Sequence, residues 1–171
     1  MLYDNPGRGS ILFTPNTVRM FGRSIQTTSD QPESGGYLFG QLFGDQLVIS
    51  VATPPGPDDV REPRFIKRIK HRGQLLLNRI WRASNRKIIL AGEWHTHFEV
   101  EPKPSTVDSE ESNKAFKKNI THLDFMVVVI VSSRAVVNSW IGVRDSKGFV
   151  QVERIGYKLW SDGVKEMESP H

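Results

Sequence analysis

Two histidines and an aspartate stand close together in the middle of the chain, at a spacing that favours metal binding. His95 and His97 follow an apolar run that predicts a strand, and a strand turns residues i and i+2 to the same face. Asp108 falls in the first turn of a helix predicted to open at Ser105, where it can face back toward the strand end. Two imidazoles and one carboxylate are a three-ligand zinc set that leaves the fourth position open for water. An open position is typical of catalytic zinc.

The composition excludes several other chemistries. The 171 residues include no cysteine, which rules out disulfides, Cys-ligated zinc, iron–sulfur clusters and thiol nucleophiles. Hydrophobic residues make up 37% and charged residues 25%, which supports one packed domain, here assigned to residues 1–160, with 161–171 as a flexible tail. The longest apolar run, Phe125 to Val131, is far shorter than the roughly 20 residues that span a bilayer. We see no secretory signal, and expect a cytoplasmic protein without membrane contact.

Positive charge is concentrated in one segment. The net charge is +4, but residues 61–90 hold ten lysines and arginines against Glu62 alone, a local +9. A nucleic-acid-binding or scaffold protein that uses this basic helix is therefore the alternative from another functional class. The segment has no aromatic pattern suited to base stacking, so we expect it to be solvated or to dock a protein rather than nucleic acid.

Predicted strands and helices alternate along the chain, and they must position the three polar residues. This alternation predicts an α/β (α+β) fold in a single unit. Thr14 followed by Pro15 predicts a helix start, and Gly44-Asp45 predicts a tight hairpin turn. The predicted strands are Ser10–Phe13, Tyr37–Phe43, Gln46–Ala52, Lys87–Trp94, Phe125–Ser132, Ala135–Val143 and Phe149–Ile155. The predicted helices run from Pro15 to Thr27, Pro63 to Ala83 and Ser105 to Asn119, with a loop at Thr53–Pro63.

The pattern His-x-His, seven residues, Ser, two residues, Asp resembles the signature of the JAMM metalloproteases, also called the MPN-plus or JAB family. An upstream segment, Glu33-Ser-Gly-Gly-Tyr-Leu-Phe-Gly, is similar to that family's Glu-x-x-Gly-x-Leu-x-Gly motif and precedes His95 by 62 residues. The resemblance covers residues 10–143. Many members of that family have Pro after the second His, where this chain has Phe98.

The resemblance implies both a fold and a site. The fold would be a single JAB/MPN domain, with a mixed, mostly antiparallel sheet flanked by helices in cytidine-deaminase-like layering. Zn²⁺ would be held by His95, His97 and Asp108. Glu33 would be the general base that takes a proton from water and gives it to the leaving amine. The Ser105 hydroxyl would stabilise the negative charge that develops on the scissile carbonyl oxygen.

The resemblance also implies a substrate class, the C-terminal tail of ubiquitin or a ubiquitin-like protein joined to a target through a peptide or isopeptide bond. Such a tail can add as an extra strand, and the Thr53–Pro63 loop with its nearby strand edge is the candidate groove. The sequence segment Gly-Glu-Trp-His-Thr-His is most similar to the corresponding segment of the JAMM peptidases of CBASS antiphage operons. Those peptidases release the C-terminus of a cyclic-oligonucleotide synthase (CD-NTase) from its conjugates. Their genes lie beside those of the synthase and of an E1–E2-like conjugating protein. The alternative within this class is a peptidase that processes a sulfur-carrier or other ubiquitin-like protein.

Each of these residues also has a purely structural interpretation. Ser105 and Asp108 form a Ser-x-x-Asp capping pair, which by itself is usually structural. Three acidic residues near the histidines are expected to be solvated or to hydrogen-bond around the site: Glu93, Glu99 and Glu101. Three further histidines have no partner at ligand spacing and are expected to be structural or exposed: His71, His122 and His171.

Overall fold

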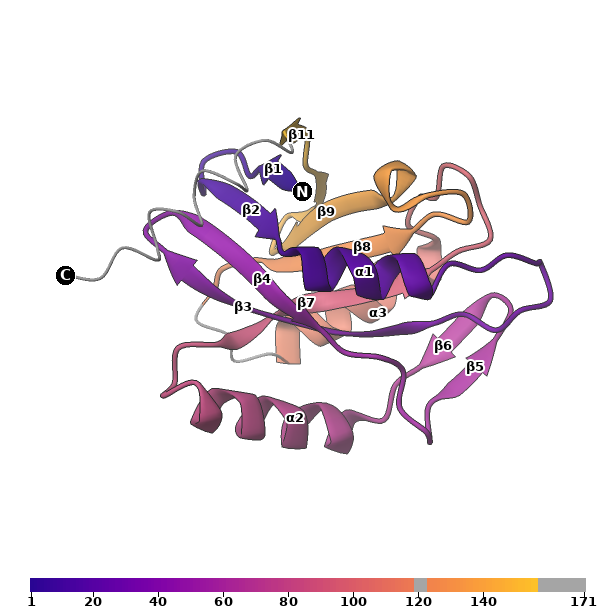
Figure 1. Ribbon diagram of the computed structural model, residues 1–171, viewed down its shortest axis with the longest axis horizontal. Helices are drawn as coiled ribbons and strands as arrows, with labels where there is room; N and C mark the ends of the chain where they lie inside the picture. Colours follow the sequence, from indigo (N-terminus) through magenta and orange to yellow (C-terminus); the bar gives the residue numbers. More distant parts are fainter. Residues whose placement is uncertain (119–122, 157–171) are drawn as a thin grey trace.

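A mixed sheet of nine strands forms the centre of the protein, in a computed structural model that describes residues 1–118 and 123–156 (Figure 1). Its strand order is β10-β9-β8-β7-β3-β4-β2-β1-β11, in which β2/β4 and β7/β8 are parallel and the other pairs antiparallel. The strands of this sheet are β1 (Leu2–Asp4), β2 (Ser10–Phe13), β3 (Gly35–Phe43), β4 (Gln46–Ala52), β7 (Ile89–Thr96), β8 (Met126–Val131), β9 (Trp140–Asp145), β10 (Gly148–Gln151) and β11 (Arg154–Gly156). The remaining elements are helices α1 (Pro15–Arg23), α2 (Lys70–Ala83) and α3 (Thr106–Lys118), the 3₁₀ turn η1 (Val136–Asn138) and a separate hairpin of β5 (Val60–Glu62) and β6 (Phe65–Lys67).

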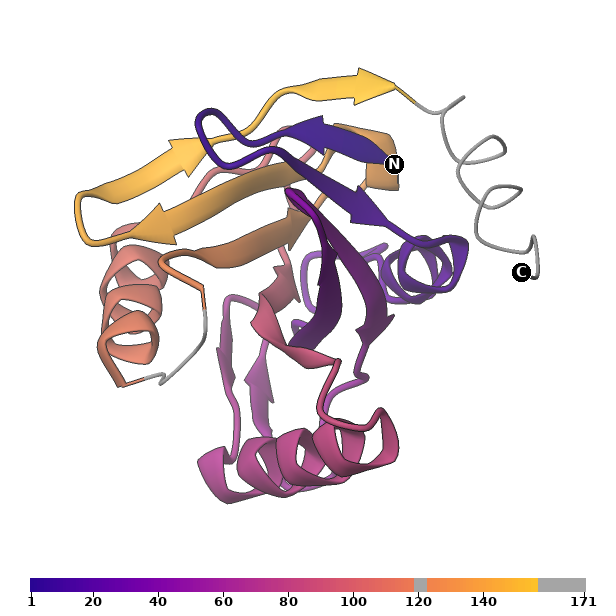
Figure 2. The ribbon, with the colours of Figure 1, turned by 90° about the vertical axis from the view of Figure 1, so that its left-hand side faces the viewer.

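The sheet curls because the strands at its two ends are nearly continuous in the chain. Only two residues separate β10, at one end, from β11, at the other. The backbone N–H of Val152 donates to Ile141 on β9, while the carbonyl of Glu153 accepts from Asp4 on β1. This segment therefore bridges β9 and β1, and the three helices lie around the curled sheet (Figure 2).

The core has two parts, one on each face of β8. Val127, Val129 and Val131 belong to the larger part, which includes Phe21 of α1. The residues that alternate with them, such as Val128 and Ile130, pack on the other face with α3. Alternation along a strand buried on both sides explains why every β8 residue is apolar, and it places α1 and α3 on opposite faces.

Several predicted elements are confirmed. The strand Ser10–Phe13 and the hairpin of β3 and β4 occur where they were predicted, and Gly44 takes a positive φ of 60° in the connecting turn. The Thr14 side chain caps α1 by accepting a hydrogen bond from the Thr17 N–H. The mixed, mostly antiparallel sheet with flanking helices is confirmed as well.

The prediction for residues 53–83 was wrong in its first half. The Thr53–Pro63 segment is not all loop, and the helix begins at Lys70 instead of Pro63, because β5 and β6 form a hairpin between them. Glu62 pairs with Phe65 across a turn that starts at Pro63. Proline presets the backbone of a turn and biases the residue before it toward an extended conformation.

Other boundaries also differ from the prediction, including those of the strand predicted at Lys87–Trp94, which runs from Ile89 to Thr96. The first helix ends at Arg23 instead of Thr27. The predicted strand Ala135–Val143 begins with the turn η1, and its ordered pairing starts at Trp140. The predicted strand Phe149–Ile155 breaks at Val152, where the chain leaves β9 for β1. The sequence patterns also missed β1, which pairs with the neighbouring strand β2 on one side and with the distant strand β11 on the other.

No helix in the described part of the chain has the length and apolar character needed to cross a membrane. The predicted tail, 161–171, lies outside the described residues, as does the end of the predicted 1–160 domain.

Candidate active site

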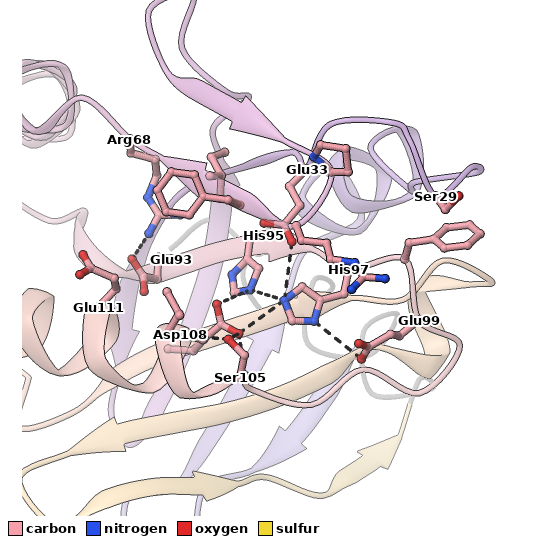
Figure 3. Close-up of a pocket in the computed structure, with 17 residues that line it drawn as sticks. Ser29, Glu33, Arg68, Glu93, His95, His97, Glu99, Ser105, Asp108 and Glu111 are labelled. Carbon is pink, nitrogen blue, oxygen red and sulfur yellow. Dashed lines mark hydrogen bonds and ion pairs between the residues drawn. The ribbon is translucent and has the colours of Figure 1, made fainter.

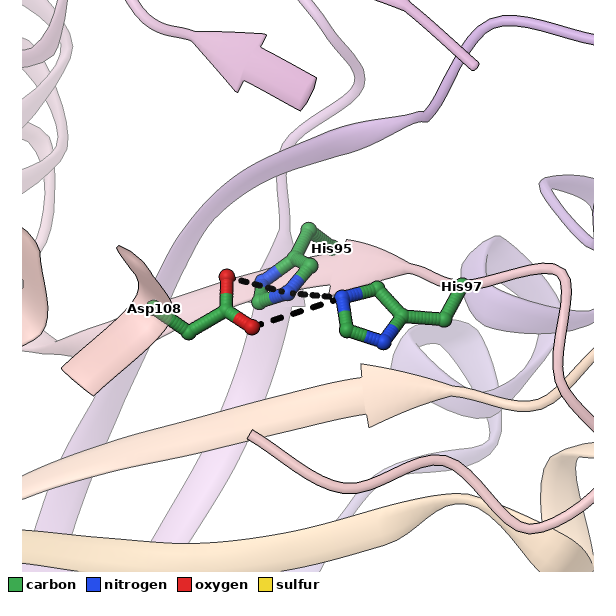
Figure 4. A group of neighbouring side chains, drawn as sticks. All are labelled: His95, His97 and Asp108. Carbon is green, nitrogen blue, oxygen red and sulfur yellow. Dashed lines mark hydrogen bonds and ion pairs between the residues drawn. The ribbon is translucent and has the colours of Figure 1, made fainter. Parts of the chain in front are cut away.

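The side chains of His95, His97 and Asp108 converge at the end of β7 (Figure 4). The Nε2 atoms of the two imidazoles are 3.1 Å apart. One Asp108 oxygen lies 3.2 Å from His95 Nε2, and the other lies 3.4 Å from His97 Nε2. The structure thus brings together the three residues that the sequence spacing predicted as metal ligands.

The ligand atoms are spaced as a small metal ion requires. Metal–ligand bonds of about 2.0–2.1 Å in a tetrahedron put ligand atoms about 3.3–3.4 Å apart. The imidazole nitrogens are 3.1 Å apart, and each lies 3.2 or 3.4 Å from one of the two Asp108 oxygens, so the separations are close to that edge length, although the two imidazoles approach different carboxylate oxygens. Two imidazole nitrogens that face each other across a carboxylate could hold a metal ion with one position left open.

The pairing of β3 with β7 brings Glu33 to the same place. Gly35 is opposite His95 in the antiparallel register, and the Thr96 N–H donates to the Ser34 carbonyl at 2.8 Å. Glu33, which lies just before β3, therefore approaches His97, and its Oε1 is 3.8 Å from the imidazole Nε2. The strands β3 and β7 are so close here that a Cβ atom on Gly35 would lie 2.7 Å from the Trp94 carbonyl oxygen. Glycine is needed here because no side chain fits.

Asp108 has a structural task as well as its place in the cluster. Its Oδ2 accepts hydrogen bonds from the backbone N–H of Ser105 at 2.7 Å and from the Ser105 hydroxyl at 2.6 Å. The Asp108 N–H donates back to the Ser105 hydroxyl at 3.1 Å. These reciprocal bonds cap the start of α3 and fix the carboxylate in orientation, so the capping interpretation and the metal-ligand interpretation both describe the same side chain.

The electrostatics of the site favour a positive charge at its centre. Burial by itself would raise the pKa of Asp108, but hydrogen bonds from His95 and His97 hold that pKa far below its usual value. Burial lowers the pKa of His97, yet the hydrogen bond and charge of Asp108 outweigh it, and the net shift is upward. A bound cation would meet this demand.

Glu33 has the environment of a group that exchanges protons. It is 5% exposed, and burial raises its pKa to about 7, with His97 opposing that rise and Asp108 adding to it. A carboxyl group with a pKa near neutrality can both accept and return a proton at physiological pH. Its position beside the cluster suits that exchange (Figure 3).

A cleft of about 420 Å³ opens over the cluster. Glu33, His95, His97, Ser105 and Asp108 all line it, so the structure brings every predicted site residue to one surface. The hairpin of β5 and β6 contributes further lining through Pro63, Arg64, Phe65 and Ile66. Of the predicted groove segment Thr53–Pro63, only its last residue lines the cleft.

The neighbouring acidic residues divide into different roles. Glu93 is buried and forms an ion pair with Arg68, which agrees with the second of its two expected roles, and both residues line the cleft. Glu99 is exposed, and one of its carboxylate oxygens lies 3.8 Å from the other ring nitrogen of His97. Glu101 is exposed and does not line the cleft.

Within the described part of the chain, no further histidine lies close enough to join His95, His97 and Asp108 as a metal ligand. His71 is exposed on α2, while His122 and His171 lie outside the described residues. Sequence reasoning missed Arg68 and Thr96 as residues that support the site, because a single basic residue in a basic segment, or a threonine in a strand, carries no distinguishing pattern.

Comparisons with known proteins agree with one another. No family model matches the chain. A protein of Escherichia coli (strain TW11681) named CD-NTase/cGAS isopeptidase is 37% identical over 117 residues, which are 68% of this chain and 70% of that protein. Proteins with the same name from Pseudomonas aeruginosa and Vibrio cholerae are 30% and 31% identical, and the matches cover 69% and 67% of this chain and 75% and 69% of theirs.

The fold also has a solved counterpart. A solution structure of a protein from Desulfitobacterium hafniense superposes with a TM-score of 0.59 at 19% identity, over 85% of this chain and 91% of that one. The likeness supports the fold and, at this identity, nothing further.

Proposed function

Because the chain belongs to the CD-NTase/cGAS isopeptidase family, we propose that it is a zinc-dependent isopeptidase of the JAMM type. Its reaction would release the C-terminus of a cyclic-oligonucleotide synthase from a conjugated target in a bacterial CBASS antiphage system. The observation that carries the proposal is the convergence of His95, His97 and Asp108 at metal-ligand distances beside the buried Glu33. We further propose that the protein acts in the cytoplasm. Residues 1–160 would form a single JAB/MPN domain.

The metal in this proposal is zinc, held by His95, His97 and Asp108. Two imidazoles and one carboxylate are a common donor set for catalytic zinc, and the cysteine-free chain leaves no thiolate to compete. When bound, zinc acts as a Lewis acid that lowers the pKa of water to about 7 and polarises a carbonyl group.

The chain's own side chains perform the proton transfers. Glu33 accepts the proton of the attacking water at a carboxylate oxygen and later gives it to the leaving amine nitrogen, so the amide bond is exchanged for a carboxyl group and an amine. The Ser105 hydroxyl, now a donor to Asp108, lies on the cleft surface where it could turn to the oxygen on which negative charge develops.

An extended peptide tail would enter along the hairpin wall of the cleft. Glu62, the last residue of β5, accepts a hydrogen bond from the Glu33 N–H, so the turn end of β5 is in contact with the Glu33 segment. Within the described residues β6 pairs only with β5, and its Phe65 and Ile66 line the cleft. A tail added beside β6 would receive main-chain hydrogen bonds and be directed to the metal cluster.

The nucleic-acid alternative is weakened by the uses of the basic residues. Arg61 donates hydrogen bonds to the Glu33 segment, Arg68 pairs with Glu93, and Arg72 lies 3.9 Å from an Asp59 oxygen. These three guanidinium groups are committed within the protein, which interrupts any continuous phosphate-binding surface on this segment. An E1–E2-like conjugating protein encoded nearby remains part of the proposal as the enzyme that makes the conjugate.

The direct test is intact-mass analysis of a CD-NTase whose C-terminal carboxyl group is joined by an amide bond to a second protein. We expect two products whose masses sum to the substrate plus one water, no products after treatment with a chelator, and recovery when zinc is added. Cleavage by the metal-free protein would refute the mechanism.

A second substrate separates the alternatives within the class. A sulfur-carrier-like protein with a C-terminal extension after Gly-Gly would be cut instead if the protein is a processing peptidase. Salt-sensitive binding to duplex DNA by a protein that purifies without zinc and cuts neither substrate would favour the nucleic-acid alternative.

A further inference from the structure

The hairpin of β5 and β6 does more than form one wall of the cleft, because it also holds the chain segment that carries Glu33. Residues 24–34 connect α1 to β3 without any helix or strand of their own. The position of Glu33 therefore depends on what its backbone contacts. One contact comes from β5, where the Glu62 carbonyl accepts the Glu33 N–H at 2.9 Å.

A single arginine on the same strand makes three further contacts with this segment. The Nε of Arg61 donates to the Glu33 carbonyl oxygen at 2.6 Å. Its Nη2 donates to the Ser34 hydroxyl at 2.9 Å and reaches the Pro32 carbonyl oxygen at 3.4 Å. The guanidinium group therefore contacts Glu33 and both of its neighbours in the chain.

The geometry of the arginine suits this task. A guanidinium group presents its donors in a flat, rigid fork, so several acceptors can be held at once in fixed relative positions. A lysine ammonium group at the same place could reach one or two of these acceptors but would not fix their spacing. Arg61 does not line the cleft, so it acts through the backbone of Glu33 and does not touch the substrate.

From these contacts we propose that Arg61 is a positioning residue for the reaction, which sets the placement of Glu33 and couples it to the hairpin. The inference rests on the proposed role of Glu33 as general base. A displacement of about 1 Å at a reacting group can cost about 100-fold in rate, so loss of the clamp is expected to lower kcat while substrate affinity stays the same.

The experiment compares Arg61→Ala, Arg61→Lys and Arg23→Ala in the full chain loaded with zinc, with the CD-NTase conjugate as substrate. We expect Arg61→Ala to lower kcat about 10- to 100-fold with little change in KM, and Arg61→Lys to recover part of that loss. Arg23 is an exposed arginine at the end of α1, outside the cleft and the hairpin, and Arg23→Ala, which removes the same side chain and charge, is expected to match the wild type. Zinc content and the unfolding midpoint are measured on each variant.

A double variant with Glu33→Gln distinguishes positioning from a general structural effect. In single turnovers Arg61→Ala is expected to cause no further loss once Glu33 is changed, because there is no base left to position. Wild-type kcat in Arg61→Ala, a change in KM alone, or an equal loss in the Glu33→Gln background would overturn the inference. If Arg61→Ala does not fold, Arg61→Lys and Ser34→Ala, which removes one acceptor, decide by the same split of kcat and KM.

Failure of the inference can be told apart from failure of the proposed function. If Glu33→Gln itself turns over at the wild-type rate, the proposed mechanism is wrong. If Glu33→Gln is inactive and Arg61→Ala is fully active, only the role of Arg61 is refuted.

Discussion

The side chain of Thr96 accepts a hydrogen bond from the backbone N–H of Ser34 at 2.9 Å, and the Thr96 N–H donates to the Ser34 carbonyl at 2.8 Å. Thr96 is fully buried and stands between His95 and His97 in the sequence, and Ser34 directly follows Glu33. This pair of bonds ties the strand that carries the imidazoles to the segment that carries the carboxylate. The buried Thr96 hydroxyl thus contributes to the relative placement of the metal ligands and the base.

Replacement of Thr96 by valine tests this connection. The two side chains have the same shape, so the change removes an acceptor and leaves the Ser34 N–H buried without its partner, at a cost of about 1–3 kcal/mol in the free energy of unfolding. We expect kcat to fall as well, since one of the two hydrogen bonds between Thr96 and the segment that carries Glu33 is lost. Urea unfolding and turnover are measured beside Thr96→Ser, which keeps the hydroxyl. Equal behaviour of the two variants would contradict the connection.

Removal of the base should abolish turnover without loss of metal. Glu33→Gln keeps the size of the side chain but cannot take a proton, and general-base catalysis contributes roughly 100- to 10,000-fold in rate. We expect kcat to fall within that range while zinc binds with the stoichiometry of the wild type. Glu101→Gln, which removes the same charge from an exposed residue outside the cleft, serves as the control. A variant that loses both zinc and activity would place Glu33 among the ligands instead.

The candidate ligands could be predicted from sequence because their signals are local. His95 and His97 share one strand face, and Asp108 stands at a fixed distance from a helix start, so each short pattern has one geometric consequence. Glu33 could be found only through its family resemblance. Its place beside His97 results from the register of β3 on β7, which joins residues far apart in the chain.

The errors in the fold have a similar origin. Phe65 and Ile69 suit the spacing of an amphipathic helix, but Phe65 and Ile66 suit a strand equally well, and the turn at Pro63 decides between them. Arg61 is one of ten basic residues in its segment, and nothing in the sequence separates the one that faces Glu33 from those that face solvent. The hairpin of β5 and β6 and the orientation of Arg61 both depend on contacts with residues distant in the chain.

Asp108 should be essential for metal binding. Asp108→Asn removes a negatively charged oxygen ligand that faces both imidazoles, and even residues that only support a ligand can change metal affinity by about 10- to 100-fold. We expect at least that loss in zinc affinity, measured by competition with a chromophoric chelator, together with loss of turnover. Glu110→Gln removes the same charge from an exposed position on the same helix and should bind zinc normally. Zinc affinity equal to that of the wild type would mean that the cluster is not the metal site.

The two roles assigned to Ser105 predict effects of different size on two measurements. As the cap of α3 its hydroxyl contributes about 0.5–2 kcal/mol to the free energy of unfolding, and Ser105→Ala should lose that amount. As a donor to the developing oxyanion it should contribute about 100- to 1,000-fold in kcat, which the loss of a cap in a folded protein does not explain. Ser105→Gly separates the two roles, because glycine at a helix cap costs only a few tenths of a kcal/mol relative to serine but has no side chain that could donate a hydrogen bond. We expect Ser105→Gly to recover stability and not turnover. If it recovers both, the hydroxyl is only a cap, and the stabilisation of the oxyanion must come from elsewhere in the cleft.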